Sequence, residues 1–217
     1  MLGYINNPLA LLGIVVSFLV AITVHEFSHA LVSDRLGDPT ARLMGRLSLN
    51  PLVHLDPIGT LLLLFAPFGY AKPVQVDPFN LRNPRRDMAL VSLAGPASNL
   101  VTAAVFSVIY QLAAGLAGSA GMPVIIAMFF LRFLIILNVN LAVFNLIPIH
   151  PLDGFAIVRG ILSEEYARQW QELQPYGMLF LFFMIFPVFG GTAPISRIMG
   201  PLTSFLLNIF LPGSPVI

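Results

Sequence analysis

The stretch His25-Glu26-Phe27-Ser28-His29 (HEFSH) decides how this sequence folds and what chemistry it can carry. It follows a run from Met1 to Val24 that contains no charged residue. Two histidines four positions apart share one face of a helix and can bind the same metal ion, while a glutamate beside the first can reach a metal-bound water as a general base. The stretch therefore predicts a hydrolytic zinc centre inside a membrane-spanning helix.

The composition is typical of an integral membrane protein. Hydrophobic residues make up 57% of the 217 residues and charged residues 10%, and the mean hydropathy is +0.87, far from the values of soluble domains. The net charge of +1 and the scattered basic residues argue against a nucleic-acid partner and leave the lipid bilayer as the expected environment. Cysteine is absent, so histidine, aspartate and glutamate are the candidate metal ligands.

Long apolar segments are expected to cross the membrane as helices, since about 20 apolar residues span the hydrocarbon core. They cover approximately residues 9–32, 88–116 and 123–146. A shorter apolar segment, 58–70, is interrupted by glycine and proline, so we expect a re-entrant or half-span element there. Two more apolar runs, near 176–189 and 198–211, predict an accessory hairpin.

The expected fold class is an all-α polytopic membrane protein with four to six transmembrane helices around an intramembrane zinc site. Residues 71–77 (AKPVQVD) alternate in a way that suits a short β-hairpin or edge strand at the membrane surface. We expect one integral membrane domain over residues 1–217, with a core at 9–160 and an accessory C-terminal hydrophobic hairpin at 173–212.

Basic residues predict the side of the membrane that the zinc site faces, because loops rich in lysine and arginine stay in the cytoplasm. Seven of them lie between the first and the second full span: Arg35, Arg42, Arg46, Lys72, Arg82, Arg85 and Arg86. Two further crossings return the chain to that side, so the end of the first helix and residues 145–155 share one leaflet. The sequence therefore predicts a multi-pass protein whose site lies toward the cytoplasmic leaflet.

A catalytic zinc usually has three protein ligands, so HEFSH needs a partner from elsewhere in the chain. Asp153 is the best candidate, because it follows an apolar span in a segment where Pro148 and Pro151 break regular helix and expose backbone. An ionisable residue at such a place is a functional hypothesis by default. The local pattern also allows Asp153 to cap a helix that begins near Phe155.

Several separated motifs resemble one known family. HEFSH matches its HExxH, residues 152–154 (LDG) match its LDG motif, and residues 95–99 (GPASN) resemble its GPxxN. Residues 49–59 (LNPLVHLDPIG) and 71–74 (AKPV) resemble segments of its short prokaryotic branch. The family is that of the site-2 proteases, intramembrane zinc metalloproteases of peptidase family M50. The resemblance covers approximately residues 9–160 and implies a compact enzyme of a prokaryotic cell membrane without a PDZ or CBS domain.

The resemblance assigns roles to named residues. It implies that His25, His29 and Asp153 bind one Zn²⁺ and that Glu26 is the general base. Asn145 matches a family asparagine that positions substrate or stabilises the oxyanion, although a hydrogen bond between helices would explain a buried asparagine equally well.

Three more polar residues leave two interpretations open. Asn99, at the GPxxN position, either faces the site and contacts substrate or packs between helices. His54 is either a gate or further ligand near the zinc or part of the loop structure. His150 stands where the family pattern has proline or a small residue, and it either reaches the metal or faces the polar interface.

The function expected from these features is hydrolysis of a peptide bond in or near the transmembrane segment of a membrane protein, with the zinc-bound water activated by Glu26. A helical substrate hides its carbonyls, so the cleaved segment must first unwind. Residues 71–77 could then hold it by strand addition, with Val74 and Val76 as the candidate substrate-binding residues. Control by a regulatory partner or by earlier cleavage of the substrate stays open, and the sequence does not define the oligomeric state.

Two other functions compete with this one. A divalent-metal transporter would use the same histidines and aspartate as transport ligands, but it has no particular need for Glu26. A catalytically silent membrane scaffold would not need the whole set of HExxH, asparagine and LDG. Retention of zinc with loss of cleavage on changing Glu26 would distinguish the enzyme from the transporter.

Overall fold

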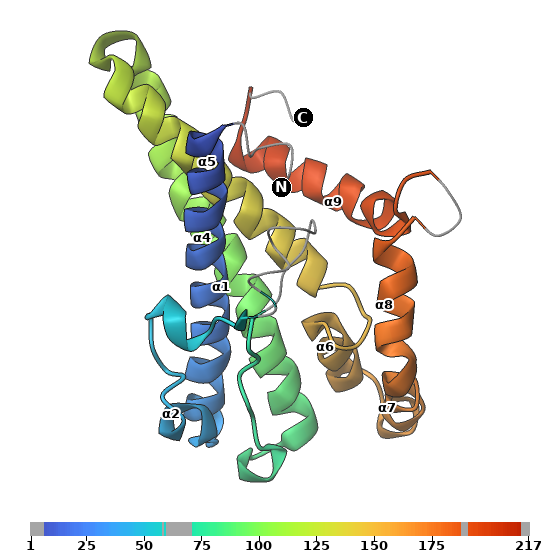
Figure 1. The fold of residues 1–217 in the computed structure, drawn as a ribbon. Helices are drawn as coiled ribbons and strands as arrows, with labels where there is room; N and C mark the ends of the chain where they lie inside the picture. The colour runs from blue at the N-terminus through green and yellow to red at the C-terminus, as the bar shows by residue number, and fades with distance from the viewer. Residues whose placement is uncertain (1–6, 58, 60–70, 188–190, 214–217) are drawn as a thin grey trace.

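The computed structural model describes residues 7–57, 59, 71–187 and 191–213, and this part of the chain is mostly helical. Figure 1 shows the longest helices side by side, with shorter helices at one end and along one flank. In chain order the elements are α1 (Pro8–Leu36), α2 (Thr40–Leu43), η2 (Pro51–Val53), η3 (Pro78–Asn80), α4 (Pro84–Ala120), α5 (Met122–Asn145), α6 (Asp153–Ile161), α7 (Glu164–Gln171), η4 (Gln174–Tyr176), α8 (Gly177–Ile185) and α9 (Pro194–Phe210).

Three helices within the described ranges are long and apolar enough to cross a membrane: α1, the Pro84–Leu116 part of α4, and α5. They correspond to the three predicted full spans. The predicted total of four to six is not confirmed, because α8 has 9 residues and α9 has 17, whereas a span takes about 20. The re-entrant element expected at 58–70 lies outside the described residues apart from Gly59.

Helix α1 carries the HEFSH stretch and has a defined start and end. The Asn7 side chain accepts a hydrogen bond from the backbone N–H of Ala10, and Pro8 occupies the first turn. At the other end Gly37 takes the left-handed conformation, with φ of 114°, which closes the helix. Small buried residues on one face, such as Ser17 and Ala21, allow a neighbouring helix to approach closely.

Helix α4 is the centre of the packing, since α1, α5 and α6 all contact it. The apolar core lies between α4, α5 and α9, where Ala103, Ile135 and Val139 are fully buried against Leu207 of α9. Helix α6 lies beside α4 near the HEFSH end of α1 (Figure 1). This arrangement brings the LDG segment to the first helix.

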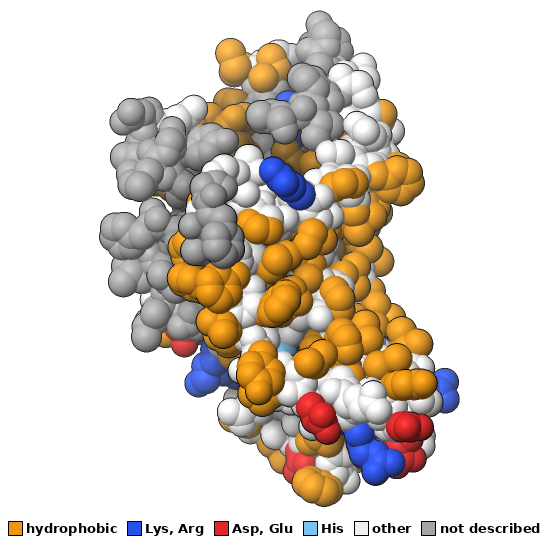
Figure 2. Space-filling view, turned by 90° about the vertical axis from the view of Figure 1, so that its right-hand side faces the viewer, with side chains coloured by type: hydrophobic (Ala, Val, Ile, Leu, Met, Phe, Trp, Pro, Cys, Tyr) orange, Lys and Arg blue, Asp and Glu red, His pale blue; other side chains and the backbone are white. Residues whose placement is uncertain are grey.

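The surface agrees with a lipid environment. Figure 2 shows hydrophobic side chains over the middle of one face, while acidic and most basic side chains gather at its lower end. On α4, Val101, Val105, Val108 and Leu112 form an exposed stripe at helical spacing, and each has more than half of its surface exposed. The protein is therefore a membrane protein whose spanning helices present apolar side chains to lipid.

The strand predicted at residues 71–77 is not formed. Among the described residues the structure has no β-strand, and the segment makes only an isolated antiparallel bridge between Leu55 and Ala71. The Lys72 N–H donates to His54 O at 2.8 Å, but Pro73 has no N–H with which to extend the pairing. The next N–H, that of Val74, points away from the bridge to Glu26 on α1. The segment is extended and lies along α1 without joining a sheet.

Candidate metal centre

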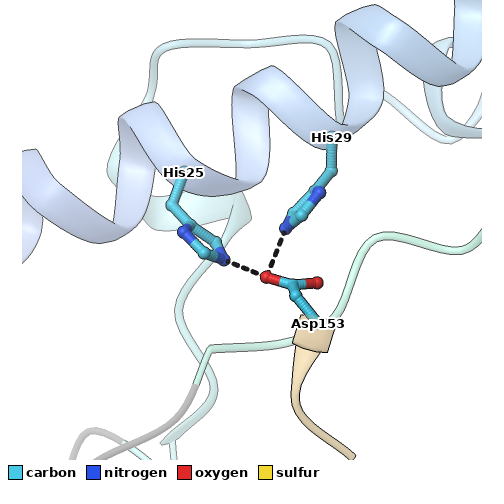
Figure 3. Close-up of side chains that lie close together, drawn as sticks. All are labelled: His25, His29 and Asp153. Carbon is cyan, nitrogen blue, oxygen red and sulfur yellow. Dashed lines mark ion pairs between the residues drawn. The ribbon is translucent and has the colours of Figure 1, made fainter. Parts of the chain in front are cut away.

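Two histidines of α1 and one aspartate of α6 converge on a single point (Figure 3). Asp153 Oδ2 lies 3.2 Å from His25 Nε2 and 3.4 Å from His29 Nε2. The two imidazole rings are nearly perpendicular, at 85°, with centroids 4.6 Å apart. Both histidines are buried and the Asp153 side chain is 16% exposed. Within the described ranges this is the one cluster of His, Asp and Glu with metal-ligand spacing.

The other ring nitrogens define the tautomers of the two histidines. His29 Nδ1 lies 2.7 Å from the backbone carbonyl oxygen of Val91, which can only accept, so this nitrogen carries the proton. His25 Nδ1 lies 2.7 Å from Asn99 Oδ1 and donates in the same way. In the neutral form of each ring, which metal binding requires, the lone pair of Nε2 would face Asp153.

The arrangement fits a bound zinc ion. Asp153 Oδ2 is buried and has no hydrogen-bond partner, and its polar neighbours are the two Nε2 atoms. Zn–N and Zn–O bonds are about 2.0–2.2 Å long, which separates tetrahedral ligand atoms by roughly 3.3 Å. The Asp153 distances of 3.2 and 3.4 Å match that separation. A shared cation would satisfy all three groups and leave the fourth position of a catalytic zinc open.

Gly95 of α4 packs directly against the imidazole rings of His25 and His29. A Cβ added at this glycine would lie 2.6 Å from His25 Cε1 and would collide with His29 Nε2. Any side chain at this position would therefore enter the space between the candidate ligands. Gly95 belongs to the GPASN stretch but had no predicted role; its place in a motif of small residues on a spanning helix was the available signal.

Asp153 is held by the local structure of α6. The helix begins at Asp153 itself, Leu152 occupies the N-cap position, and no side chain caps the helix, so the capping alternative for Asp153 is wrong. A Cβ on Gly154 would lie 2.6 Å from the Ile147 carbonyl carbon, which shows how closely the LDG turn packs on the segment before it. The Trp170 indole N–H donates to Phe155 O at 3.0 Å. These contacts leave the Asp153 carboxylate pointing toward α1.

Glu26 lies beside the metal cluster and not within it. Its side chain is buried, with 8% exposed, and Glu26 Oε2 accepts a hydrogen bond of 3.2 Å from the Val74 N–H. Residues 71–77 therefore run past the candidate general base. Val74 and Val76 are half-buried, whereas Lys72 and Gln75 are exposed, so the segment presents alternate faces although it is not a strand.

Asp38 connects the C-terminal end of segment 71–77 to the end of α1 through hydrogen bonds. Its carboxylate accepts hydrogen bonds from Ser33, Thr40, the Asp77 N–H at 2.9 Å and the Asn80 amide at 2.9 Å. Burial would raise the pKa of the Asp38 carboxyl, but these hydrogen bonds outweigh burial and hold the pKa at about 2. The carboxylate is therefore ionised at neutral pH and fixes the segment that borders Glu26.

Three other predicted site residues, Asn145, His54 and His150, make contacts with groups outside the cluster. Asn145 donates from its side chain to Leu141 O of its own helix at 3.0 Å. His54 is fully buried; its Nε2 donates to Ser48 O at 2.7 Å, and it belongs to the loop that pairs with Lys72. His150 packs edge-on against Phe155, and burial lowers its pKa. Neither histidine joins the group of potential metal ligands in the described part of the chain.

Comparison with known families and proteins agrees with this chemistry. Residues 13–188 match the family described as "Peptidase family M50". "Putative zinc metalloprotease YwhC" of Bacillus subtilis (strain 168) is 38% identical over 189 residues, which are 85% of this chain and 86% of that protein. "Putative zinc metalloprotease Rip2" of Mycobacterium tuberculosis (strain ATCC 25618 / H37Rv) is 32% identical over 195 residues, 82% of this chain and 70% of that protein. No solved structure matches the chain.

The apolar helices and the His, His and Asp cluster, together with these matches, define a zinc metalloprotease of the membrane. The chain belongs to peptidase family M50. The predicted family, enzyme class and zinc cofactor are thereby confirmed. The matched region extends to residue 188, beyond the core that the sequence motifs had outlined at 9–160.

Proposed function

We propose that the protein is an intramembrane zinc protease that hydrolyses a peptide bond in or near the transmembrane segment of a membrane protein. The observation that carries this proposal is the position of the cluster: His25 and His29 lie on an apolar helix of 29 residues, and Asp153 completes a three-ligand set against them. In this proposal His25 Nε2, His29 Nε2 and Asp153 Oδ2 hold the zinc ion. A substrate that reaches this site must itself lie in the membrane.

The proposed chemistry assigns Glu26 the proton transfers. Bound zinc supplies Lewis-acid chemistry, which polarises the scissile carbonyl and lowers the pKa of water. Glu26, adjacent in sequence to His25 and buried, takes the proton from the attacking water and delivers it to the leaving amine. Asn145 remains our candidate donor to the developing oxyanion, since breaking its bond to Leu141 O would free the amide. In this role the Asn145 amide N–H would donate a hydrogen bond to that oxygen.

The extended segment 71–77 is the proposed substrate-docking element. Its Val74 N–H contacts Glu26, so a substrate strand laid along its free edge would pass close to the catalytic base. Val74 and Val76 are half-buried, and in this proposal the backbone between them pairs with the substrate. Strand addition would also hold the substrate unwound, which helix cleavage requires.

The proposed orientation places the site toward the cytoplasmic leaflet. Arg35 lies in the last turn of α1, and Arg42 of α2 pairs with Asp34 of α1 at 3.1 Å. Arg85 and Arg86 lie in the first turn of α4, which begins at the same end of the molecule (Figure 1). Positive loops remain cytoplasmic. We also propose that residues 1–217 act as one catalytic domain with 173–212 as an accessory hairpin, and that a regulatory partner controls substrate access.

The decisive experiment compares the wild type with Glu26→Gln in zinc content and in cleavage of a transmembrane peptide in detergent. Glutamine preserves shape and the Val74 hydrogen bond but cannot accept a proton, so one zinc per chain in both proteins and cleavage by the wild type alone are expected. Cleavage by the variant would refute Glu26 as the base. A metal transporter predicts instead that Glu26→Gln leaves zinc flux into vesicles unchanged, and a silent scaffold predicts no cleavage by either protein.

A further inference from the structure

A chain of buried amide hydrogen bonds connects α5 through α4 to His25 on α1. Asn138 of α5 donates from Nδ2 to Leu134 O of its own helix at 2.8 Å, which turns its Oδ1 outward. Asn99 of α4 donates from Nδ2 to that Oδ1 at 2.9 Å. The side chains of both asparagines have no exposed surface. Neither residue touches Asp153, and neither is needed for the three-ligand set itself.

The direction of every bond in this chain is determined by groups that can only accept. Asn99 Nδ2 faces the Asn138 oxygen and, at 2.9 Å, the backbone oxygen of Ala21, so the amide nitrogen cannot exchange places with the oxygen. Asn99 Oδ1 is thereby held 2.7 Å from His25 Nδ1 and accepts its proton. The remaining nitrogen, Nε2, faces Asp153 at 3.2 Å and in the neutral ring carries the lone pair that can bind a metal.

We propose that Asn99 is a positioning residue that fixes the tautomer and ring orientation of His25, and that Asn138 holds Asn99 in the orientation this requires. The inference rests on the zinc site proposed above and deepens it. In a metal-binding histidine, the group that accepts a hydrogen bond from the non-ligating nitrogen determines which nitrogen binds the metal and how basic that nitrogen is. Loss of this acceptor typically lowers metal affinity about 10- to 100-fold. The role differs from both interpretations of Asn99 made from sequence, substrate contact and helix packing.

His29 provides an internal reference for this role. Its Nδ1 proton goes to the backbone oxygen of Val91, which no side-chain substitution removes. A change at Asn99 therefore perturbs one of the two histidines and leaves the partner of the other intact. Asn140 provides a matched control, because it lies on α5 two residues from Asn138 and makes the same kind of bond to its own helix, to Ile136 O at 2.8 Å.

The test compares wild type, Asn99→Leu, Asn99→Asp and Asn140→Leu in full-length protein in detergent. Zinc affinity is measured by chelator competition, the coordination of substituted Co²⁺ by its visible spectrum, and fold by thermal melting. Leucine at residue 99 should lower zinc affinity about 10- to 100-fold and alter the Co²⁺ spectrum, since the His25 proton loses its acceptor. Asn140→Leu should leave both unchanged.

The aspartate variant separates positioning from packing. Both Asn99 variants lose the donor bonds to Ala21 and Asn138, so both should melt at a lower temperature, but only aspartate keeps an acceptor for His25 and should retain near wild-type zinc affinity. Equal zinc affinity in Asn99→Leu and the wild type would overturn the proposal, as would equal losses in Asn99→Leu and Asn99→Asp. Failure of the wild type to bind zinc or cobalt would overturn the zinc site itself.

A measurement on the unmodified protein covers the case in which Asn99→Leu does not fold. The chain has four histidines, so ¹⁵N-histidine NMR of the zinc-loaded wild type should give a short list of signals, assignable with His54→Gln and His150→Gln. The proposal requires that His25 carry its proton on Nδ1 and bind metal through Nε2. Metal binding through Nδ1 of His25 would overturn it while leaving the zinc protease function standing.

Discussion

Replacing Gly95 with alanine should empty the metal site without unfolding the protein. The added methyl group would lie 2.6 Å from His25 Cε1 and closer still to His29 Nε2, whereas carbon atoms in contact prefer about 3.5–4.0 Å. One or both rings must therefore move by roughly 1 Å, several times the deviation of about 0.2 Å that zinc–ligand distances tolerate. We expect at least about a 100-fold loss of zinc affinity, or about 3 kcal/mol, together with loss of proteolysis.

Gly115→Ala is the matched control for Gly95→Ala, because Gly115 lies on the same helix and an added Cβ would meet no atom of another element within 4 Å. Gly115→Ala should bind zinc as the wild type does and gain about 0.5–1 kcal/mol of stability from its helix preference. Zinc would be titrated against a chromogenic chelator, with circular dichroism reporting helix content. If Gly95→Ala bound zinc as tightly as Gly115→Ala, the close approach of α4 to the ligands would be refuted.

Two further predictions concern the segment that borders Glu26. Val74→Pro removes the N–H that donates to Glu26 and should lower kcat at least about 10-fold with zinc content intact. Val76→Pro should also impair turnover, because proline removes a backbone donor from the proposed docking segment. Full activity of either variant in zinc-loaded protein would refute a role for this segment. The pKa of Asp38 in the folded protein, about 2, lies below its ordinary value of about 3.9, so its ionisation contributes stability that is fully present above pH 4 and is lost as the pH falls toward 2. Asp38→Asn should therefore lower the free energy of unfolding at pH 7 by on the order of 2 kcal/mol, which thermal melts would detect as a lower melting temperature. The difference in melting temperature from the wild type should narrow at pH 3. A difference that stays constant with pH would show that Asp38 does not act through its charge.

The helical frame could be predicted because its signals are local. An uncharged run followed by HEFSH defines α1, and the histidine spacing of four places both rings on one face. Counting membrane crossings predicted that the LDG turn and the HEFSH end of the first helix lie in the same leaflet. The structure brings Asp153 next to His25 and His29. That these three bind the zinc, and that the core ends near residue 160, remain predictions.

The details that failed or were missed depend on contacts between distant residues. Alternation at 71–77 suggested a strand, but Pro73 interrupts the pairing and Val74 gives its N–H to a carboxylate on another helix. The count of four to six spans is not confirmed, because apolar composition does not show where a helix ends, and α8 and α9 have 9 and 17 residues. Gly95 and Asn99 act across a helix interface, and a single sequence does not show which face of α4 meets α1.

Asp153 lies more than a hundred residues after the two candidate histidine ligands, and this order has a consequence for synthesis. The ribosome synthesises α1, which carries both histidines, long before it reaches Asp153 at the start of α6. Until then the growing chain holds an incomplete set of ligands next to other newly inserted membrane segments. On the proposed ligand assignment, proteolysis would begin only after α6 has emerged and docked on α4, so the growing chain would be inactive until then.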